Sequence, residues 1–236
     1  MRKILSLLAA TVVAAGLGSE VATAIASHAE LPSPASFVSH VDNPWFPLTP
    51  GTVYVYRGSR DGLPARDVLT VTHKTRTIQG IRATVIDDRL YLRGRLRERT
   101  TDWYAQDKAG TVWYLGEKTA TLGVDGRVKS TDGTWEAGVD GAQAGIYMPA
   151  HPRVGETGEQ EFYKGHAEDH FKVLGRSAQI HTPAASSRDA LLTQETTPLE
   201  PGVVDHKVYV RGIGTVREEA VKGGKERLVL ISVRRP

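Results

Sequence analysis

The stretch TDWYAQDKAGTVWYLGE, Thr101–Glu117, decides the fold class of this 236-residue chain. Two runs of aromatic and β-branched residues flank the tetrapeptide Asp107-Lys108-Ala109-Gly110. This tetrapeptide fits a type I turn whose last residue is left-handed, a conformation that glycine adopts without steric cost. The stretch therefore predicts a β-hairpin.

The two faces of the predicted hairpin differ in character. Side chains alternate along a strand, so Ala105 is expected to oppose Trp113 and Trp103 to oppose Leu115, which gives an apolar face belonging to the core. The other face carries Asp102, Tyr104, Gln106, Val112 and Tyr114. A carboxylate beside two tyrosines fits the polar wall of a cavity inside a barrel, and it also fits a solvated surface.

Similar short runs, separated by turn residues, continue through the rest of the chain. The predicted strands are Thr52–Arg57, Val68–Thr77, Arg82–Leu92, Arg95–Gln106, Thr111–Glu117, Glu159–Tyr163, Ala167–Leu174, Ala178–Thr182, Ala190–Thr197, Val204–Val210, Gly214–Val221 and Glu226–Val233. Their hairpin connections are expected at Asp61-Gly62, Gln79-Gly80, Ala109-Gly110 and Gly223-Gly224. The pattern predicts an all-β fold, an antiparallel meander that closes into a barrel or a two-sheet sandwich, with residues 51–236 as a single β domain.

Residues 123–158 depart from this pattern. They are rich in glycine and contain few β-branched side chains. We expect a long ordered loop or lid at about 123–158, because long loops within compact β domains often carry binding residues.

The N-terminus has the features of an export signal. Arg2 and Lys3 precede the uncharged apolar run Ile4–Gly18, and small residues suited to signal peptidase follow at Ala22-Thr23-Ala24 and Ser27-His28-Ala29. The run is shorter than the roughly 20 residues that span a bilayer. Residues 1–29 are therefore predicted to be a signal peptide and the mature protein to be secreted or periplasmic, with no membrane anchor after processing. Residues 30–50, rich in proline and serine, form an extended lead-in.

Composition excludes several classes of function. The chain has no cysteine, which rules out disulfides, thiol nucleophiles and cysteine metal sites, and its formal net charge is only +3. The one dense basic run is Arg93, Arg95, Arg97 and Arg99. These arginines alternate along a predicted strand and are expected to share a solvated face. A nucleic-acid site would need interleaved aromatics and a larger charge excess, so no nucleic-acid partner is predicted.

The predicted loop offers one pair of carboxylates. In GTWEAGVDGA, Gly133–Ala142, the acids Glu136 and Asp140 lie near Trp135. An indole can stack on a sugar ring while carboxylates bind its hydroxyl groups, and such a pair can also serve a glycosidase as acid and base. The alternative is that both acids are solvated and Trp135 packs inward.

The segment QEFYKGHAEDHFK, Gln160–Lys172, offers a second candidate site. If it is one strand, His166, Glu168 and His170 project from one face, and this set suits Zn²⁺ or Fe²⁺ with a hydrolytic water. The opposite face carries Glu161, Tyr163, Asp169 and Phe171. A solvated edge-strand face explains the same residues and is favoured. No cofactor is predicted, and a divalent metal is the alternative.

Four segments resemble a family of exported bacterial proteins of unassigned function. They are NPWFPLTPGT (Asn43–Thr52), DWYAQDKAGTVWYLGE (Asp102–Glu117), GTWEAGVDGA (Gly133–Ala142) and the AED of residues 167–169. The resemblance covers most of the chain after the predicted signal peptide. It implies that these segments belong to one site, and it implies no activity.

Together these patterns predict a secreted β-barrel or β-sandwich protein that binds a small polar or amphipathic ligand. The expected ligand-binding residues are Asp102, Tyr104, Tyr114, Trp135, Glu136, Asp140, Glu161, Glu168 and Asp169. One alternative is a hydrolase or lyase that acts on carbohydrate through Glu136 and Asp140, or on another substrate through metal bound by His166, Glu168 and His170. Another is a structural envelope protein without a cavity.

Overall fold

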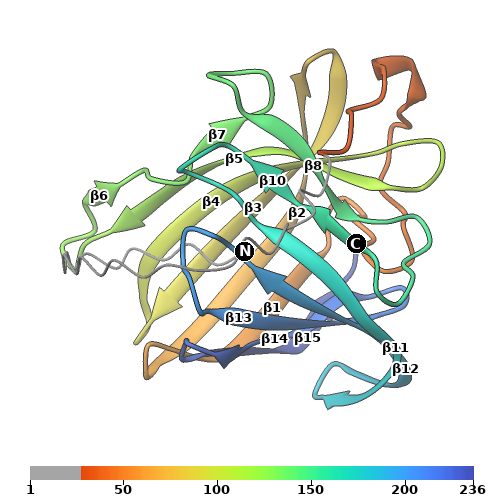
Figure 1. Cartoon of the computed structure of the whole chain (residues 1–236). Coiled ribbons are helices and arrows are strands. Elements are labelled where there is room, and N and C mark those ends of the chain that lie inside the picture. The colour runs from red at the N-terminus through yellow and green to blue at the C-terminus, as the bar shows by residue number, and fades with distance from the viewer. Residues whose placement is uncertain (1–27) are drawn as a thin grey trace, which may run out of the picture.

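The computed structural model describes residues 28–236, which form one antiparallel sheet nearly closed into a barrel (Figure 1). Within the described residues, a short 3₁₀ turn, η1 (Pro34–Ser36), precedes the strands. The strands are β1 (Val53–Arg60), β2 (Leu63–Ile78), β3 (Ile81–Leu92), β4 (Arg95–Gln106), β5 (Val112–Leu122), β6 (Val128–Ser130), β7 (Trp135–Glu136), β8 (Gln143–Met148), β9 (Thr157–Glu159), β10 (Glu161–Phe162), β11 (His170–Thr182), β12 (Ala185–Thr196), β13 (Val204–Val210), β14 (Gly214–Lys222) and β15 (Glu226–Arg234).

The strand order follows the chain almost throughout. It runs β10-β8-β5-β4-β3-β2-β1-β15-β14-β13-β12-β11-β9, and β6 and β7 pair with β5 beside β8. The first and last strands, β1 and β15, pair with each other along their whole length. The predicted antiparallel all-β meander is therefore confirmed, and the single continuous sheet is a barrel rather than a two-sheet sandwich.

Six residues, 157–162, join the two edges of this sheet. Three of them, in β9, pair with β11, and two, in β10, pair with β8. Between them, the Gln160 amide donates a 2.7 Å hydrogen bond to the Asp169 carbonyl. Gly145 of β8 lies so near that a Cβ there would be 2.4 Å from the carbonyl carbon and oxygen of Gln160. We call residues 157–162 the seam, because the barrel closes there.

Four two-residue turns have positive φ at both residues, as tight turns of this kind require: Asp61-Gly62, Gln79-Gly80, Arg93-Gly94 and Asp140-Gly141. The first two were predicted. The third corrects the expected row of four arginines, because Arg93 lies in the turn and only Arg95, Arg97 and Arg99 belong to β4.

The β4–β5 hairpin contains a bulge that its sequence did not reveal. Ala105 opposes Trp113 as predicted, but Trp103 opposes Gly116 and not Leu115, so that part of the prediction is wrong. Gly116 has φ +137°, which glycine adopts readily, and a Cβ there would be 2.5 Å from the Trp135 carbonyl oxygen. Beyond the bulge, Glu117 takes the position opposite Asp102.

Residues 123–158 are more regular than the predicted long loop. They contain β6, β7 and β8 and the start of β9, joined by turns.

The lead-in, residues 30–50, is anchored to the barrel. Trp45 and Phe46 are buried, and the Asn43 side chain donates hydrogen bonds to the carbonyls of Gly110 at 2.8 Å and Pro149 at 3.1 Å.

The predicted signal peptide falls outside the described residues, except for His28 and Ala29. His28 Nδ1 lies 2.6 Å from Glu159 Oε2 of the seam, and Ala29 packs against the core. Within residues 28–236, no helix has the length and apolar character needed to cross a membrane.

Replacement of Gly145 by alanine tests how tightly the seam is packed. We expect Gly145→Ala to lower the free energy of unfolding by roughly 1–3 kcal/mol, because the new methyl group meets backbone atoms that cannot rotate away. Urea denaturation followed by tryptophan fluorescence measures the change. Gly175→Ala in β11 is the matched control, since a Cβ there meets nothing within 4 Å. Equal stability of the two variants would contradict the tight seam.

Candidate functional site

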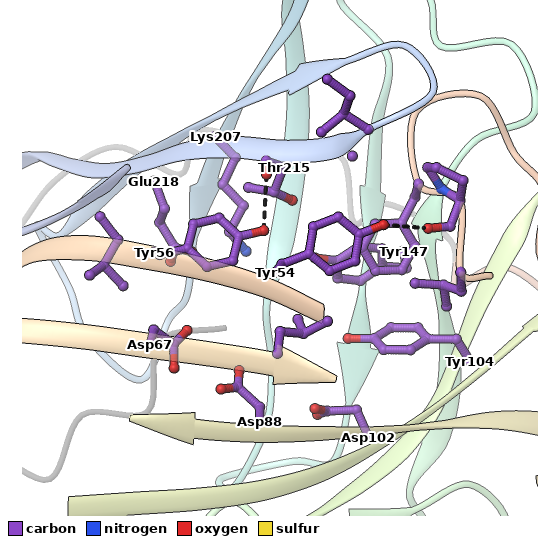
Figure 2. A pocket seen from close by; sticks show the side chains of 17 residues that line it. Tyr54, Tyr56, Asp67, Asp88, Asp102, Tyr104, Tyr147, Lys207, Thr215 and Glu218 are labelled. Carbon is purple, nitrogen blue, oxygen red and sulfur yellow. Dashed lines mark hydrogen bonds between the residues drawn. The ribbon is translucent and has the colours of Figure 1, made fainter. Parts of the chain in front are cut away.

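The barrel interior contains a cavity of about 70 Å³ (Figure 2). Its walls come from β1, β2, β3, β4, β8, β13, β14 and β15 and from the end of the lead-in. Five aromatic rings line it: Phe46, Tyr54, Tyr56, Tyr104 and Tyr147. The charged groups that line it are Asp67, Asp88, Asp102, Glu218 and Lys207. The cavity thus combines aromatic walls with four carboxyl groups and one ammonium group.

Three of the carboxyl groups come from adjacent strands. Asp67 is on β2, Asp88 on β3 and Asp102 on β4, and Figure 2 shows them side by side below the tyrosines. They are not directly paired: Leu69 opposes Asp88, and Ile86 opposes Asp102, so each aspartate is offset by two residues from the next. Strands in a barrel are tilted, and an offset of two residues per strand brings such side chains to one level of the interior.

Asp67 and Asp88 interact with each other at the cavity wall. Burial raises the pKa of Asp67 well above its ordinary value of 3.8, and the charge and hydrogen bond of Asp88 raise it further. Asp88 Oδ1 is itself buried and has no hydrogen-bond partner within the described part of the chain. The pair therefore presents a carboxyl group with a raised pKa and one buried acceptor atom at the cavity.

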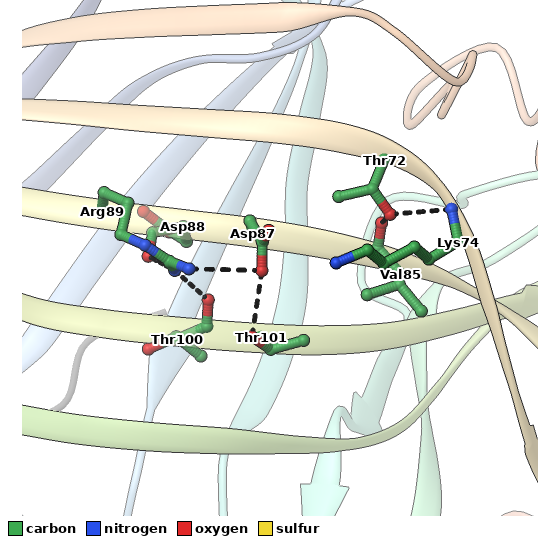
Figure 3. Close-up of polar contacts among 8 residues, drawn as sticks. All are labelled: Thr72, Lys74, Val85, Asp87, Asp88, Arg89, Thr100 and Thr101. Atoms are coloured by element: carbon green, nitrogen blue, oxygen red, sulfur yellow. Dashed lines mark hydrogen bonds and ion pairs between the residues drawn. The ribbon is translucent and has the colours of Figure 1, made fainter.

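The outer face of β3 holds Asp88 in place (Figure 3). Arg89, which alternates with Asp88 and lies outside, donates from Nη1 to the carbonyls of Asp88 at 2.6 Å and Thr100 at 2.8 Å. Its Nη2 lies 3.4 Å from Asp87 Oδ1, which also accepts a 3.1 Å bond from the Thr101 hydroxyl. These bonds fasten β3 to β4 at the level of the aspartates.

A second outer contact in Figure 3 compensates for an irregularity between β2 and β3. The ladder shifts register between Val71 and Thr75, and the Thr72 hydroxyl there donates a 2.8 Å bond to the Val85 carbonyl. A side chain thus replaces a lost ladder bond, and β3 keeps its position.

Aromatic side chains pack in a cluster at one end of the cavity. Tyr104 stacks on Tyr114 with ring centroids 4.6 Å apart, and Tyr147 meets the edge of Tyr104 at 4.9 Å. Tyr147 also lies 4.3 Å from Phe46. Burial raises the pKa of the Tyr104, Tyr114 and Tyr147 hydroxyls, so these groups stay neutral.

Two buried hydrogen bonds anchor this cluster to acids. The Tyr114 hydroxyl donates to Asp102 Oδ1 at 2.7 Å. The Trp135 indole, edge-on to Tyr114 at 5.2 Å, donates from Nε1 to Glu161 Oε2 at 2.8 Å. The hydrogen bond from Tyr114 therefore fixes the orientation of the Asp102 carboxyl group at the cavity wall.

Lys207 is the one basic residue among the described residues that line the cavity. It is only 2% exposed, and its Nζ lies 2.6 Å from Glu195 Oε2. Burial alone would lower the pKa of Lys207, but the charges of Glu195 and Glu218 outweigh burial and raise it well above 10.5. The ammonium charge is thus matched by Glu195, which does not line the cavity.

A smaller hollow of about 20 Å³ lies behind this ion pair. Its acidic lining includes Asp169, Glu195 and Asp205, and Glu218 lines both hollows. Burial, followed by the charge of Glu195, raises the pKa of Asp169 to about 6. The barrel interior is therefore acidic well beyond the cavity itself.

The predicted ligand-binding residues divide into two groups. Asp102 and Tyr104 line the cavity, Tyr114 lies directly behind them, and Trp135 and Glu161 form the next layer. Glu136 and Asp140 instead border a surface pocket of about 350 Å³, together with the edge of Trp135, Arg76 and Trp103. There Glu136 forms an ion pair with Arg76, whose guanidinium lies 4.4 Å over the Trp103 ring.

The segment that contains the candidate metal ligands His166, Glu168 and His170 is not one strand. Residues 164–166 form a turn closed by a bridge between Tyr163 and Ala167, and β11 begins only at His170. His166 stacks on Tyr163, and Glu168 accepts a 2.6 Å bond from the Gly165 amide. The alternation that would have aligned His166, Glu168 and His170 is therefore broken. Across residues 28–236, no three His, Cys, Asp or Glu side chains are grouped to hold a metal ion.

Sequence reasoning missed most of the cavity. Asp67, Asp88, Glu218, Lys207, Tyr54, Tyr56 and Tyr147 were not predicted as site residues. The sequence contained a signal for two of them. Asp88 is two residues from Ile86 and from Leu90, which are both buried, and Lys207 is two residues from buried Tyr209. A charged residue in phase with core residues must face the interior.

Comparison with known proteins adds little to this description. No protein-family model matches the chain, and no curated protein matches it. A solved structure of a "putative lipoprotein" from Parabacteroides distasonis is similar, with a TM-score of 0.44 and 14% identity over 80% of this chain and 98% of that one.

Asp67→Asn tests the raised pKa of the Asp67 carboxyl group. A raised carboxyl pKa stabilises the fold fully below pH 3.8, and this contribution is lost as the pH rises through the folded-state pKa. We expect the variant to be more stable than the parent at pH 8 and about equal at pH 4, since the amide can still donate to Asp88. The difference in free energy of unfolding between the variant and the parent should change by at most about 1.4 kcal/mol per pH unit. Urea denaturation from pH 4 to 8 measures it, with exposed Asp132→Asn as the control. Parallel curves for the parent and Asp67→Asn would refute the raised pKa.

Lys207→Met tests the buried ion pair. Loss of the ammonium group leaves Glu195 buried with its charge uncompensated, and breaking such a pair costs roughly 3–5 kcal/mol. The double variant Lys207→Met/Glu195→Gln is expected to regain much of this loss, because no uncompensated charge remains at that position. Denaturation at pH 7.5 measures the free energy of unfolding of the single and the double variant. A double variant no more stable than the single one would show that the charge pairing is not the cause.

Proposed function

We propose that this chain is an exported β-barrel protein that binds a small amphipathic ligand inside the barrel. The observation that carries the proposal is the cavity, whose lining combines five aromatic rings with four carboxyl groups. Ligand sites in proteins are typically concave and largely apolar, with a few convergent polar groups that fix the orientation of the ligand.

The cavity is too costly to be an ordinary packing defect. Protein interiors are close-packed, and buried charges normally lower stability unless they are paired. Here Asp67 and Asp88 line an internal space, where burial raises the pKa of Asp67, although aliphatic residues would fill the barrel more favourably. Such an arrangement is expected where a ligand, rather than the fold, makes use of the groups.

The size of the cavity limits the ligand. A buried water needs about 10–15 Å³ of such space, so 70 Å³ accommodates about five waters or a ligand of similar size. The ligand is therefore a small molecule, and not a lipid chain or an oligosaccharide.

Export is supported by the sequence of the N-terminus. Arg2 and Lys3 followed by the short apolar run Ile4–Gly18 fit a signal peptide, and the absence of cysteine fits a chain that needs neither a disulfide nor a lipid attached to cysteine. We therefore place the ligand-binding barrel in the periplasm or outside the cell.

The hydrolase or lyase alternatives have weaker support. Glu136 and Asp140 share the surface pocket, but the Glu136 carboxylate is already engaged in an ion pair with Arg76. The broken alignment of His166 and His170 removes the geometric basis for the proposed metal triad.

A cavity-blocking variant tests the proposal. Leu69 of β2 lines the cavity, and Leu69→Phe is expected to occupy the space without adding charge. A library of fragments of four to eight heavy atoms, screened by ligand-observed NMR, should give binders to the parent that Leu69→Phe loses. Val124→Phe, at a position 71% exposed, is the control and should keep them. Absence of any binder that is sensitive to Leu69→Phe would refute ligand binding in the cavity.

A further inference from the structure

We infer that a basic surface on the outside of the barrel binds the headgroups of an anionic lipid membrane. The surface covers the outer wall of β1–β4 near their turns and the adjoining β5–β6 hairpin. We call it the basic face, and its exposed basic residues include Arg57, Arg66, Arg95, Arg99, Arg127 and Lys129. The inference goes beyond ligand binding in the cavity and does not depend on it.

The strand register makes the wall of the basic face continuous. Arg57 on β1 lies opposite Arg66 on β2, and Arg66 lies opposite Tyr91 on β3. Two residues along β3 from Tyr91, Arg89 lies opposite Arg99 on β4. Arginines therefore follow one another across four adjacent strands.

The β5–β6 hairpin, which projects at the left of the barrel in Figure 1, extends this wall. Arg97 Nε donates a 2.9 Å hydrogen bond to the Leu122 carbonyl. Arg95 Nη1 donates to the Val124 carbonyl at 3.5 Å. These bonds fasten the hairpin to β4, so the basic residues of the hairpin lie beside those of β4.

The fold itself gains nothing from this concentration of charge. Arg57 with Arg66, and Arg89 with Arg99, are direct cross-strand neighbours, and like charges at such positions are destabilising. Asp87, an acid on the same face, is already bound by Arg89. The formal net charge of the whole chain is only +3, so the excess of positive charge is local. A surface of this kind suits an anionic partner.

The tip of the hairpin adds apolar side chains to the charge. Val124 is 71% exposed and Val128 48% exposed, and Arg127 and Lys129 are next to Val128 in the sequence. Asp125 lies 3.9 Å from Lys129 in an exposed pair, which contributes little. Exposed valines among basic residues suit a membrane interface, because the valines can enter the lipid while the bases contact the headgroups. A nucleic acid would instead need aromatic rings on which its bases could stack.

Vesicles that differ in charge test the basic face. The protein used is the chain from His28 onward, because residues 28–236 contain the whole barrel and the apolar run Ile4–Gly18 would itself bind lipid. We expect vesicles of equal parts phosphatidylglycerol and phosphatidylcholine to bind it at least about twentyfold more tightly than phosphatidylcholine vesicles at low salt, and NaCl at about 0.5 M to abolish the difference. Co-sedimentation measures the affinity. Equal binding to the two kinds of vesicle at low salt would overturn the inference.

Removal of two charges locates the binding surface. We expect Arg66→Gln/Arg99→Gln to bind the phosphatidylglycerol vesicles at least about tenfold more weakly, since each basic residue near an anionic surface contributes about fivefold. Arg176→Gln/Arg188→Gln is the matched control: it removes the same charge from exposed positions on β11 and β12 and should change the affinity by less than about twofold. Circular dichroism checks that both variants are folded. Equal affinities of the two folded variants would overturn the inference.

A tryptophan at the hairpin tip distinguishes a membrane from a soluble polyanion and does not depend on the arginine variants. We expect Val124→Trp to add a blue-shifted emission when the phosphatidylglycerol vesicles bind, measured as the difference from the parent, whose four tryptophans are buried. Val154→Trp, at a position 65% exposed and outside the basic face, should add none. Absence of the shift in Val124→Trp would overturn the inference, and tight binding of dextran sulfate would then assign the basic face to a soluble polyanion.

Discussion

Closure of the sheet by the seam is the constraint on which the rest of the structure depends. Only three ladder pairs on one side and two on the other hold it, so side chains supply much of the attachment. Every residue from 159 to 161 reaches a different part of the molecule: Glu159 bonds His28, Gln160 donates to Glu195 at 3.3 Å, and Glu161 accepts from Trp135. Without this closure the interior would open to water, and the burial that raises the pKa of Asp67 would be lost.

The same closure explains why polar groups persist inside. In a closed barrel every second residue of each strand faces one enclosed space, so a carboxylate on one strand meets those of its neighbours without any local sequence motif. Two arrangements inside the barrel reduce the repulsion between these carboxyl groups. Lys207 and Glu195 neutralise each other, and the interaction with Asp88 raises the pKa of Asp67 beyond the effect of burial. Asp102 and Glu218 border the same cavity.

The sequence was informative where structure is local. The boundaries of β4 and β13 are the predicted ones, and the turn residues at Asp61-Gly62 and Gln79-Gly80 placed two hairpins correctly. Asp102 and Tyr104 could be predicted to share a face because both lie on one strand. Their partners could not, because Asp67, Asp88 and Glu218 join them only through the offset between strands, which depends on the tilt of the closed barrel. The seam was predicted in part, as the strand Glu159–Tyr163, but its pairing with two different strands could not be predicted from strands this short.

The bulge at Gly116 explains why some predicted site residues lie inside the barrel and others on its outer surface. Alternation along a regular β5 would keep even-numbered residues such as Tyr114 on the inner face, but the bulge at Gly116 shifts the phase, and Glu117 becomes the inward residue opposite Asp102. Because β7 pairs with β5 beyond the bulge, Trp135 lies opposite Glu117 and faces inward, where it meets Tyr114 and Glu161. Its neighbour Glu136 must then face outward, toward Arg76. Residues adjacent in sequence thus belong to opposite sides of the barrel wall, and the acids that serve the interior come from other strands.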